Sequence, residues 1–295
     1  MTLKPWHGIV VAATLPFKDD LSVDYDRFAE HVRFLADNGV HGVTPNGSLG
    51  EYQVLTAAER ARVVEVAVEA APEGFSVIPG VGAYGSAESR RWTEQAQAAG
   101  AHAVLALPPN AYRADAEEVV AHYREISQVG LPIVAYNNPF DTRVDLTAEL
   151  LSRLAEVDNV VAVKEFSGDI RRITAIQRLA PQIDVLSGAD DNVFEATLLG
   201  AVGWIGGFSN SLPKQCAKIY EYGTTGQVEK GRALYQQLQA AFFWDTTHQF
   251  VQAIKLSQDV AGGYGGPCRP PRNPLSDETR AQVIKDVEQA LSAEL

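Results

Sequence analysis

Eight short apolar segments recur along this chain of 295 residues, separated by stretches with the pattern of amphipathic helices. The segments lie at residues 9–15, 41–44, 75–78, 103–107, 133–136, 160–163, 183–186 and 203–205. Strands that alternate with helices form βαβ units with a parallel sheet. Eight such units indicate closure, so the sequence predicts a (β/α)8 TIM barrel. A doubly wound open sheet is the alternative, with its ligand where the strand order reverses.

Helical patterns between these segments include residues 24–38, 56–71, 87–99 and 116–128. The second of them opens with Thr56 and Glu59, the spacing of a capping box. The barrel is expected to end near Tyr222, because further helical patterns follow at residues 227–247, 250–259 and 277–293. We therefore expect two parts: a barrel of residues 1–222 and a C-terminal helical extension of residues 223–295 packed on it.

The composition limits the partners that this chain can bind. A net charge of −12, with no basic patch to offset it, argues against nucleic acid and against anionic membranes. Cys216 and Cys268 are too few for a disulfide framework or a metal site, and the six histidines show no metal-binding spacing. The first residues lack the pattern of a signal peptide, so we expect a cytoplasmic protein with a small-molecule ligand.

Two glycine-rich segments match nucleotide-binding patterns only in part. Residues 80–85 fit GxGxxG, but the next strand segment ends at Leu107 without an acidic residue to hold a ribose. Residues 261–266 are not followed by the Lys-Ser or Lys-Thr of a phosphate loop. We therefore predict neither a dinucleotide site nor a phosphate loop.

Lys164 follows the apolar run of residues 160–163, which is typical of a strand buried on both faces. The end of such a strand points into the mouth of a barrel. Lowering the pKa of a lysine from about 10.4 to 7 costs about 4.6 kcal/mol, and burial can supply this shift. A neutral amine at this position forms Schiff bases. The alternative is a lysine that reaches solvent or pairs with Glu165.

Two other strand ends carry polar groups toward the same mouth. The second strand runs into Pro45-Asn46-Gly47-Ser48-Leu49-Gly50-Glu51-Tyr52, whose glycines permit a tight turn that aims backbone N–H groups at a carboxylate. The alternative there is an ordinary Asn-Gly turn. The fifth strand ends at Tyr136, one barrel position before Lys164. A phenol can relay a proton to and from a carbinolamine, although a lone strand-end tyrosine is more often a packing residue.

Four segments, in this order and spacing, resemble the dihydrodipicolinate synthase/N-acetylneuraminate lyase superfamily of class I aldolases. They are Gly47-Ser48-Leu49-Gly50-Glu51, Tyr136-Asn137-Asn138-Pro139, Val163-Lys164-Glu165 and Leu186-Ser187-Gly188-Ala189-Asp190-Asp191. The resemblance covers nearly the whole chain. It implies a (β/α)8 barrel with a helical C-terminal extension, a homotetramer built from dimers, and chemistry that needs no metal or cofactor.

The resemblance also implies roles for individual residues. Lys164 matches the lysine that condenses with pyruvate or another 2-oxo acid, and Tyr136 matches the proton-transferring tyrosine. Ser48 and the backbone of Leu49 match the turn that binds the carboxylate, and Gly188 and Ile205 fall where the family lines the pocket floor. The expected substrate-binding residues are Gly47, Ser48, Leu49, Asn138, Phe166, Gly188 and Ile205.

Three departures from the family pattern concern the second substrate and the proton relay. Leu49 stands where many members carry a threonine, and leucine cannot relay a proton. Asp141 stands where the synthases place an arginine that grips the aldehyde substrate's carboxylate, with Arg143 two residues on. Tyr112 lies in the loop from which the synthases lend a tyrosine to the neighbouring subunit. The residues expected to form the imine are nevertheless all present.

We therefore expect a Schiff-base-forming lyase, of aldolase or dehydratase type, that acts on pyruvate or a 4-hydroxy-2-oxo acid. Leu49, Phe140, Phe166 and Phe208 indicate a pocket less polar than that of a sugar-acid aldolase, with room for deoxy-sugar acids or a cyclic imine. Three alternatives stay open: the dihydrodipicolinate synthase of lysine biosynthesis, a hydroxyproline-pathway pyrroline carboxylate deaminase, and a non-catalytic 2-oxo acid sensor.

Overall fold

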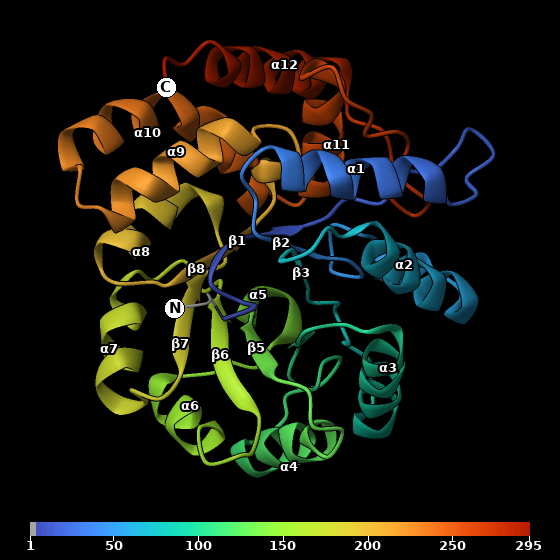
Figure 1. The fold of residues 1–295 in the computed structure, drawn as a ribbon, viewed down its shortest axis with the longest axis vertical. Coiled ribbons are helices and arrows are strands. Elements are labelled where there is room, and N and C mark those ends of the chain that lie inside the picture. The colour runs from blue at the N-terminus through green and yellow to red at the C-terminus, as the bar shows by residue number, and fades with distance from the viewer. Residues whose placement is uncertain (1–3) are drawn as a thin grey trace.

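The computed structural model describes residues 4–295 and has eight parallel strands at its centre, surrounded by helices (Figure 1). The strands are β1 (Gly8–Ala12), β2 (Gly42–Thr44), β3 (Ser76–Val77), β4 (Val104–Ala106), β5 (Ile133–Asn137), β6 (Val160–Glu165), β7 (Asp184–Ser187) and β8 (Gly203–Gly206). They neighbour one another in the order β3-β2-β1-β8-β7-β6-β5-β4, so the first strand pairs with the last.

The two remaining edges, β3 and β4, meet just beyond β3. A parallel bridge joins Gly80 to Leu105. The N–H of Val81 donates to the Leu105 carbonyl at 2.9 Å, and the N–H of Leu105 donates to the Pro79 carbonyl at 2.9 Å. The sheet is therefore closed, which confirms the predicted barrel and excludes the open, doubly wound alternative.

Helices follow the strands in the predicted alternation, and short 3-10 helices (η) interrupt several connections. The capping box predicted at Thr56 and Glu59 is confirmed: Glu59 N–H donates to Thr56 Oγ1 at 3.2 Å, and Thr56 N–H donates to Glu59 Oε2 at 2.9 Å. The elements are α1 (Tyr25–Asp37), η1 (Tyr52–Val54), α2 (Ala57–Ala70), α3 (Ser86–Ala99), α4 (Ala116–Ser127), α5 (Pro139–Thr142), α6 (Ala148–Leu154), α7 (Arg171–Leu179), η2 (Asp190–Asn192), α8 (Val193–Leu198), η3 (Phe208–Asn210) and α9 (Pro213–Thr224).

The last helices lie together at one end of the molecule, at the top of Figure 1, with α12 in contact with α10 and α11. They are α10 (Val228–Phe242), η4 (Phe243–Thr246), α11 (Phe250–Val260) and α12 (Asp277–Leu291). The helix predicted over residues 227–247 thus ends early, at Phe242, and continues as η4. This change of helix type buries Asp245, which is 7% exposed. Among residues 4–295, no helix is long and apolar enough to cross a membrane.

Strand β6 runs two residues beyond the predicted apolar segment, so Lys164 lies inside the strand. Lys164 pairs in register with Tyr136 of β5 and with Leu186 of β7. Parallel strands in register present neighbouring side chains at the same level of the barrel. The pairing therefore brings the predicted lysine and tyrosine to one level at the mouth.

Gly80, the first glycine of residues 80–85, has a packing role. A Cβ atom added to Gly80 would lie 2.3 Å from the carbonyl oxygen of Asn46, in the turn after β2. The Gly80 N–H also donates to the Pro45 carbonyl at 2.8 Å. Only glycine permits the two connections to approach this closely, which accounts for the partial GxGxxG match.

A buried ion pair joins the turn after β2 to α11. Lys255 Nζ lies 2.7 Å from Glu51 Oε1, and the two side chains are 2% and 0% exposed. Lys255 also donates to the Pro267 carbonyl at 2.7 Å, and the Arg269 N–H donates to Glu51 Oε2 at 3.0 Å. The C-terminal helices are therefore tied to the turn that contains Ser48 and Leu49.

Candidate active site

A cavity of about 750 Å³ opens at the C-terminal ends of the strands, where barrel enzymes carry their chemistry. Of the predicted site residues, those that line it are Gly47, Ser48, Leu49, Tyr136, Asn138, Lys164, Phe166 and Gly188. Ile205 differs: it is fully buried within β8, and the wall beside it is made by Gly206 and Gly207. Apart from Ile205, the fold gathers the predicted residues around one space.

The amine of Lys164 lies in a buried, largely apolar setting. The residue is 6% exposed, and Nζ lies 4.3 Å from the centroid of the Tyr136 ring and 5.8 Å from that of Phe166. Burial lowers the pKa of Lys164 from 10.5 to about 8, against the opposing effect of the carboxylates of Asp245 and Asp190. At pH 7 this pKa gives roughly 300-fold more neutral amine than an unperturbed lysine has.

The phenol of Tyr136 is buried with the amine. Its oxygen accepts a long hydrogen bond of 3.4 Å from Asn138 Nδ2, and its ring packs edge-on against Phe166 with the centroids 6.4 Å apart. Burial, followed by the negative charge of Asp245, raises the pKa of Tyr136 above its ordinary value. At neutral pH Tyr136 therefore holds its proton and can pass it on only in exchange for another.

Two buried aspartates act on Lys164 from different segments. Asp190 accepts hydrogen bonds from Trp204 Nε1 at 2.9 Å, from Phe208 N at 2.8 Å and from Gly207 N at 3.0 Å. Burial raises the pKa of Asp190 to about 6, and these donors oppose the rise. Burial also raises the pKa of Asp245, and the neighbouring charge of Asp190 adds to the effect.

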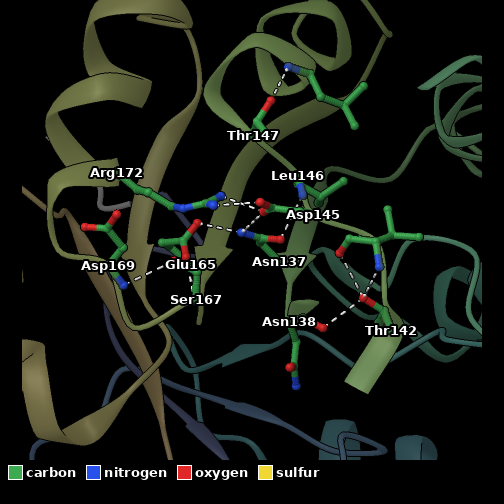
Figure 2. A network of polar contacts seen from close by, with 12 residues as sticks. Asn137, Asn138, Thr142, Asp145, Leu146, Thr147, Glu165, Ser167, Asp169 and Arg172 are labelled. Atoms are coloured by element: carbon green, nitrogen blue, oxygen red, sulfur yellow. Dashed lines mark hydrogen bonds and ion pairs between the residues drawn. The ribbon is translucent and has the colours of Figure 1, made fainter. Parts of the chain in front are cut away.

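A polar network lies on the other side of β5 and β6 (Figure 2). Asn137 Nδ2 donates to Glu165 Oε2 at 2.8 Å, and the Leu146 N–H donates to Asn137 Oδ1 at 2.9 Å. Arg172 makes two hydrogen bonds with the carboxylate of Asp145, at 2.6 and 2.7 Å. Paired, charge-assisted bonds of this kind hold their partners in a fixed geometry.

This network fixes the direction of the residues next to it in the strands. Neighbouring side chains in a strand point to opposite faces, so holding Asn137 and Glu165 on one side directs Tyr136 and Lys164 to the other. The carboxylate of Glu165 is engaged by Asn137 and by the Ser167 N–H, which donates to its Oε1 at 2.6 Å. Glu165 therefore makes its hydrogen bonds on the face of the sheet opposite Lys164. Among the described residues, the ion pair between Lys164 and Glu165 that the sequence left open is not formed.

The turn after β2 offers hydrogen-bond donors to the cavity. Asn46 and Glu51 adopt left-handed conformations, with φ of 57° and 52°, which bend the chain sharply on both sides of Ser48 and Leu49. Within residues 4–295, neither the Ser48 N–H nor the Leu49 N–H has a hydrogen-bond partner. Successive N–H groups in such a turn form a concave anion-binding site, suited to a carboxylate.

Two of the three departures from the family pattern, at Asp141 and at Tyr112, lie in different surroundings. Asp141, in α5, lines the cavity, and its Oδ2 accepts from Asn138 Nδ2 at 2.9 Å. Arg143 is exposed, and Tyr112 is 49% exposed; neither is among the described residues that line the cavity. The wall thus carries the carboxylate of Asp141 and, among the described residues, no arginine.

Sequence reasoning missed one wall of the cavity. This wall comes from the C-terminal helices and consists of Asp245, Thr246, Thr247, His248 and Phe250. No motif marks this segment, and its one local signal is the run of Trp, Asp and two Thr residues that ends the helical pattern. Among residues 4–295, no group of three or more His, Cys, Asp or Glu side chains is arranged to hold a metal ion.

Comparison with known proteins gives consistent matches over almost the full length. The chain is 32% identical to the 4-hydroxy-tetrahydrodipicolinate synthase of Methanothrix thermoacetophila over 288 residues, which cover 96% of each chain. It is 31% identical to a DapA-like lyase of Halobacterium salinarum over 282 residues, 95% of this chain and 93% of that one.

Solved structures give the same result for the fold. The structure of dihydrodipicolinate synthase from Aquifex aeolicus superposes with a TM-score of 0.91 at 27% identity, over 96% of this chain and 98% of that chain. The model of the dihydrodipicolinate synthetase family matches residues 5–290. A match of this extent, on a closed barrel with a buried lysine at its mouth, shows that the chain belongs to the dihydrodipicolinate synthetase family, whose members are lyases that act through a lysine Schiff base.

Proposed function

We propose that this enzyme condenses the amine of Lys164 with a 2-oxo acid, either pyruvate or a 4-hydroxy-2-oxo acid, and then breaks a carbon–carbon or carbon–oxygen bond. The observation that carries the proposal is the buried amine, with a pKa of about 8, lying 4.3 Å from the Tyr136 ring in the cavity. The dihydrodipicolinate synthase of Acinetobacter baumannii, to which the chain is 26% identical with a TM-score of 0.89 over 96% of this chain and 98% of that one, is described as complexed with pyruvate. This likeness supports pyruvate as the first ligand to test.

In this mechanism the Ser48 hydroxyl and the Leu49 N–H hold the substrate carboxylate while Lys164 attacks the ketone carbon. Tyr136 moves protons between the nucleophile and the carbinolamine oxygen. The protonated imine then acts as an electron sink, which allows cleavage or elimination at the neighbouring carbons. Asn138, Phe166 and Gly188 complete the walls around the bound acid, and Ile205 supports the floor from within β8.

The charges of the wall favour a substrate with one carboxylate. Asp141, Asp191 and Asp245 line the cavity, and no arginine does so among the described residues. A second carboxylate would be repelled by Asp141 and would find no arginine in this wall, whereas hydroxyl groups or a protonated nitrogen would be accepted. This favours 4-hydroxy-2-oxo acids and deoxy-sugar acids. A pyrroline carboxylate deaminase is the second candidate, because its substrate carries one carboxylate and one ring nitrogen.

Borohydride reduction in the presence of pyruvate tests the imine directly. We expect irreversible inactivation and addition of the reduced pyruvyl mass to Lys164, with a labelling rate that rises with pH up to about 8, because the amine must be neutral to attack. Peptide mass spectrometry locates the adduct, and a panel of 2-oxo acids ranks the substrates.

The matched control is Lys164→Met, which keeps the length of the side chain and should take up no label. Labelling at another lysine, or none with any 2-oxo acid, would contradict the proposal. Turnover of the 2-oxo acid that labels best separates an enzyme from a sensor that binds without reaction.

A second prediction concerns the activity after which many relatives are named. We expect little dihydrodipicolinate synthase activity, because Asp141 replaces an attractive, often bidentate contact to the second carboxylate by repulsion. The loss of such a contact costs about 2 to 5 kcal/mol, roughly 30-fold to several thousandfold in affinity. A coupled assay with pyruvate and aspartate semialdehyde measures it. A turnover near the usual enzyme value of about 10 per second would show that Arg143 or Tyr112 supplies the missing contact.

The proposal extends to the organisation of the protein. We infer a homotetramer formed from dimers, as the family resemblance implies, and a cytoplasmic enzyme. We also infer a barrel of residues 1–222 that carries the reactive lysine, with residues 223–295 as a helical extension. The contacts of α12 with α10 and α11 support this division.

A further inference from the structure

Asp245 brings a carboxyl group from the C-terminal helices into the wall that surrounds Lys164. It lies in η4, is 7% exposed, and lines the same cavity as the lysine. A Cβ atom added to Gly207, which lines the floor, would lie 3.0 Å from Asp245 Oδ1. The carboxyl group therefore lies against Gly207, one of the glycines that line the cavity.

The two buried aspartates differ in their hydrogen bonds. The carboxylate of Asp190 accepts hydrogen bonds from three donors. The carboxyl group of Asp245, by contrast, accepts one long hydrogen bond, 3.3 Å from the Asp190 N–H to Oδ2. A buried carboxyl group that accepts so few hydrogen bonds costs free energy when it is ionised. Burial and the charge of Asp190 accordingly raise the pKa of Asp245 well above its ordinary value, so this carboxyl group keeps its proton to higher pH than an exposed aspartate does.

Imine formation needs such an acid. A neutral amine and a ketone give a neutral carbinolamine, and its hydroxyl group leaves as water only when it gains a proton. The product is a cation at the former amine nitrogen. In a site of low dielectric, creating this cation without a nearby anion is expensive.

We propose that Asp245 supplies the proton that converts the carbinolamine at Lys164 into the protonated imine and then remains as the counter-ion of that imine. This inference rests on the proposed function. The proton passes from the Asp245 carboxyl group to the Tyr136 phenol as the phenol gives its own proton to the departing hydroxyl. The carbon–oxygen bond breaks to release water, and the nitrogen lone pair forms the carbon–nitrogen double bond.

The net charge of the site does not change in this step. A neutral amine and a neutral acid become a cation and an anion, and the proton returns when the imine is hydrolysed. The ionisable groups that act on Asp245 are Asp190 and Asp191 from η2 and Lys164 from β6. The negative charge of Asp245 in turn raises the pKa of both Lys164 and Tyr136.

The test is the rate of borohydride trapping with pyruvate, measured across pH for Asp245→Asn. We expect the maximal rate to fall by about 10²-fold, the lower range for a positioned acid. We also expect the pH profile of the rate to move, because the carboxyl group that titrates beside Lys164 is gone. A purely structural role would lower the rate without moving the profile.

Two further variants complete the test. Asp245→Glu restores an acid and should trap faster than Asp245→Asn. Glu229→Gln removes the same charge from an exposed position on α10, and it should leave the rate and the profile unchanged. The inference is overturned if wild type is trapped and Asp245→Asn matches its rate and profile, or if the Asn and Glu variants are equally impaired. Failure of wild type itself to be trapped would overturn the proposed function instead.

Discussion

Substitution of Tyr136 by phenylalanine is expected to lower turnover of the best 2-oxo acid substrate by about 10² to 10⁴, the range for loss of a positioned proton donor. The ring stays in place because it packs against Phe166 and lies below the amine of Lys164. The hydroxyl group makes one long hydrogen bond, 3.4 Å from Asn138 Nδ2, so its removal should cost little stability. Steady-state kinetics and a thermal melt of the same preparation measure both effects.

Tyr123→Phe is the matched control for this variant. Tyr123 is also fully buried in the barrel, and its hydroxyl group donates to the Ala106 carbonyl at 2.9 Å. Its removal should cost about 1 kcal/mol of stability and leave turnover unchanged. Normal turnover of Tyr136→Phe would mean that Tyr136 is a packing residue.

Substitution of Lys255 by methionine is expected to destabilise the protein by about 3 to 5 kcal/mol, because the carboxylate of Glu51 then stays buried without its ammonium partner. The pair lies 2.7 Å apart, and the Glu51 side chain is 0% exposed. The free energy of unfolding in urea measures the loss. The double variant Glu51→Gln with Lys255→Met should recover part of it, since no unpaired charge remains.

A surface pair provides the control for this second experiment. Lys218 lies 2.9 Å from its partner, Glu221, but the two side chains are 34% and 49% exposed. Exposed pairs of this kind contribute little, so Lys218→Met should change the free energy of unfolding far less than Lys255→Met. If the two variants lower the free energy of unfolding equally, burial does not increase the contribution of the Glu51–Lys255 pair to stability.

The barrel could be predicted from the sequence because its signals are local. Continuous apolar runs mark the strands, and Thr56 with Glu59 marks the start of a helix. Lys164 and Tyr136 could be singled out because each stands at the end of an apolar run, and the C-terminal ends of barrel strands share one face. The extension of β6 to Glu165 could not be predicted, since it depends on pairing with β5 and β7.

The cavity wall that comes from the C-terminal helices depends on contacts between residues far apart in the sequence. Asp245 lies within a helical pattern that predicts one helix as far as residue 247, and its burial depends on η2, some 55 residues earlier in the chain. The partner of Glu51 lies 204 residues away and has no sequence signal that could identify it. Such pairings arise from packing the last helices on the barrel mouth, which local propensity does not describe.

The cavity draws its reactive amine from β6 and one of its walls from residues 245–250, more than 80 residues later. A barrel strand cannot change without disturbing its neighbours, whereas a connecting segment tolerates exchange far better. Recombination of residues 246–250 between relatives, with Asp245 kept in place, should therefore change the choice of leaving group while the covalent step at Lys164 persists. In this arrangement, a new activity can arise by exchange of one short segment that contains none of the groups proposed to form the imine.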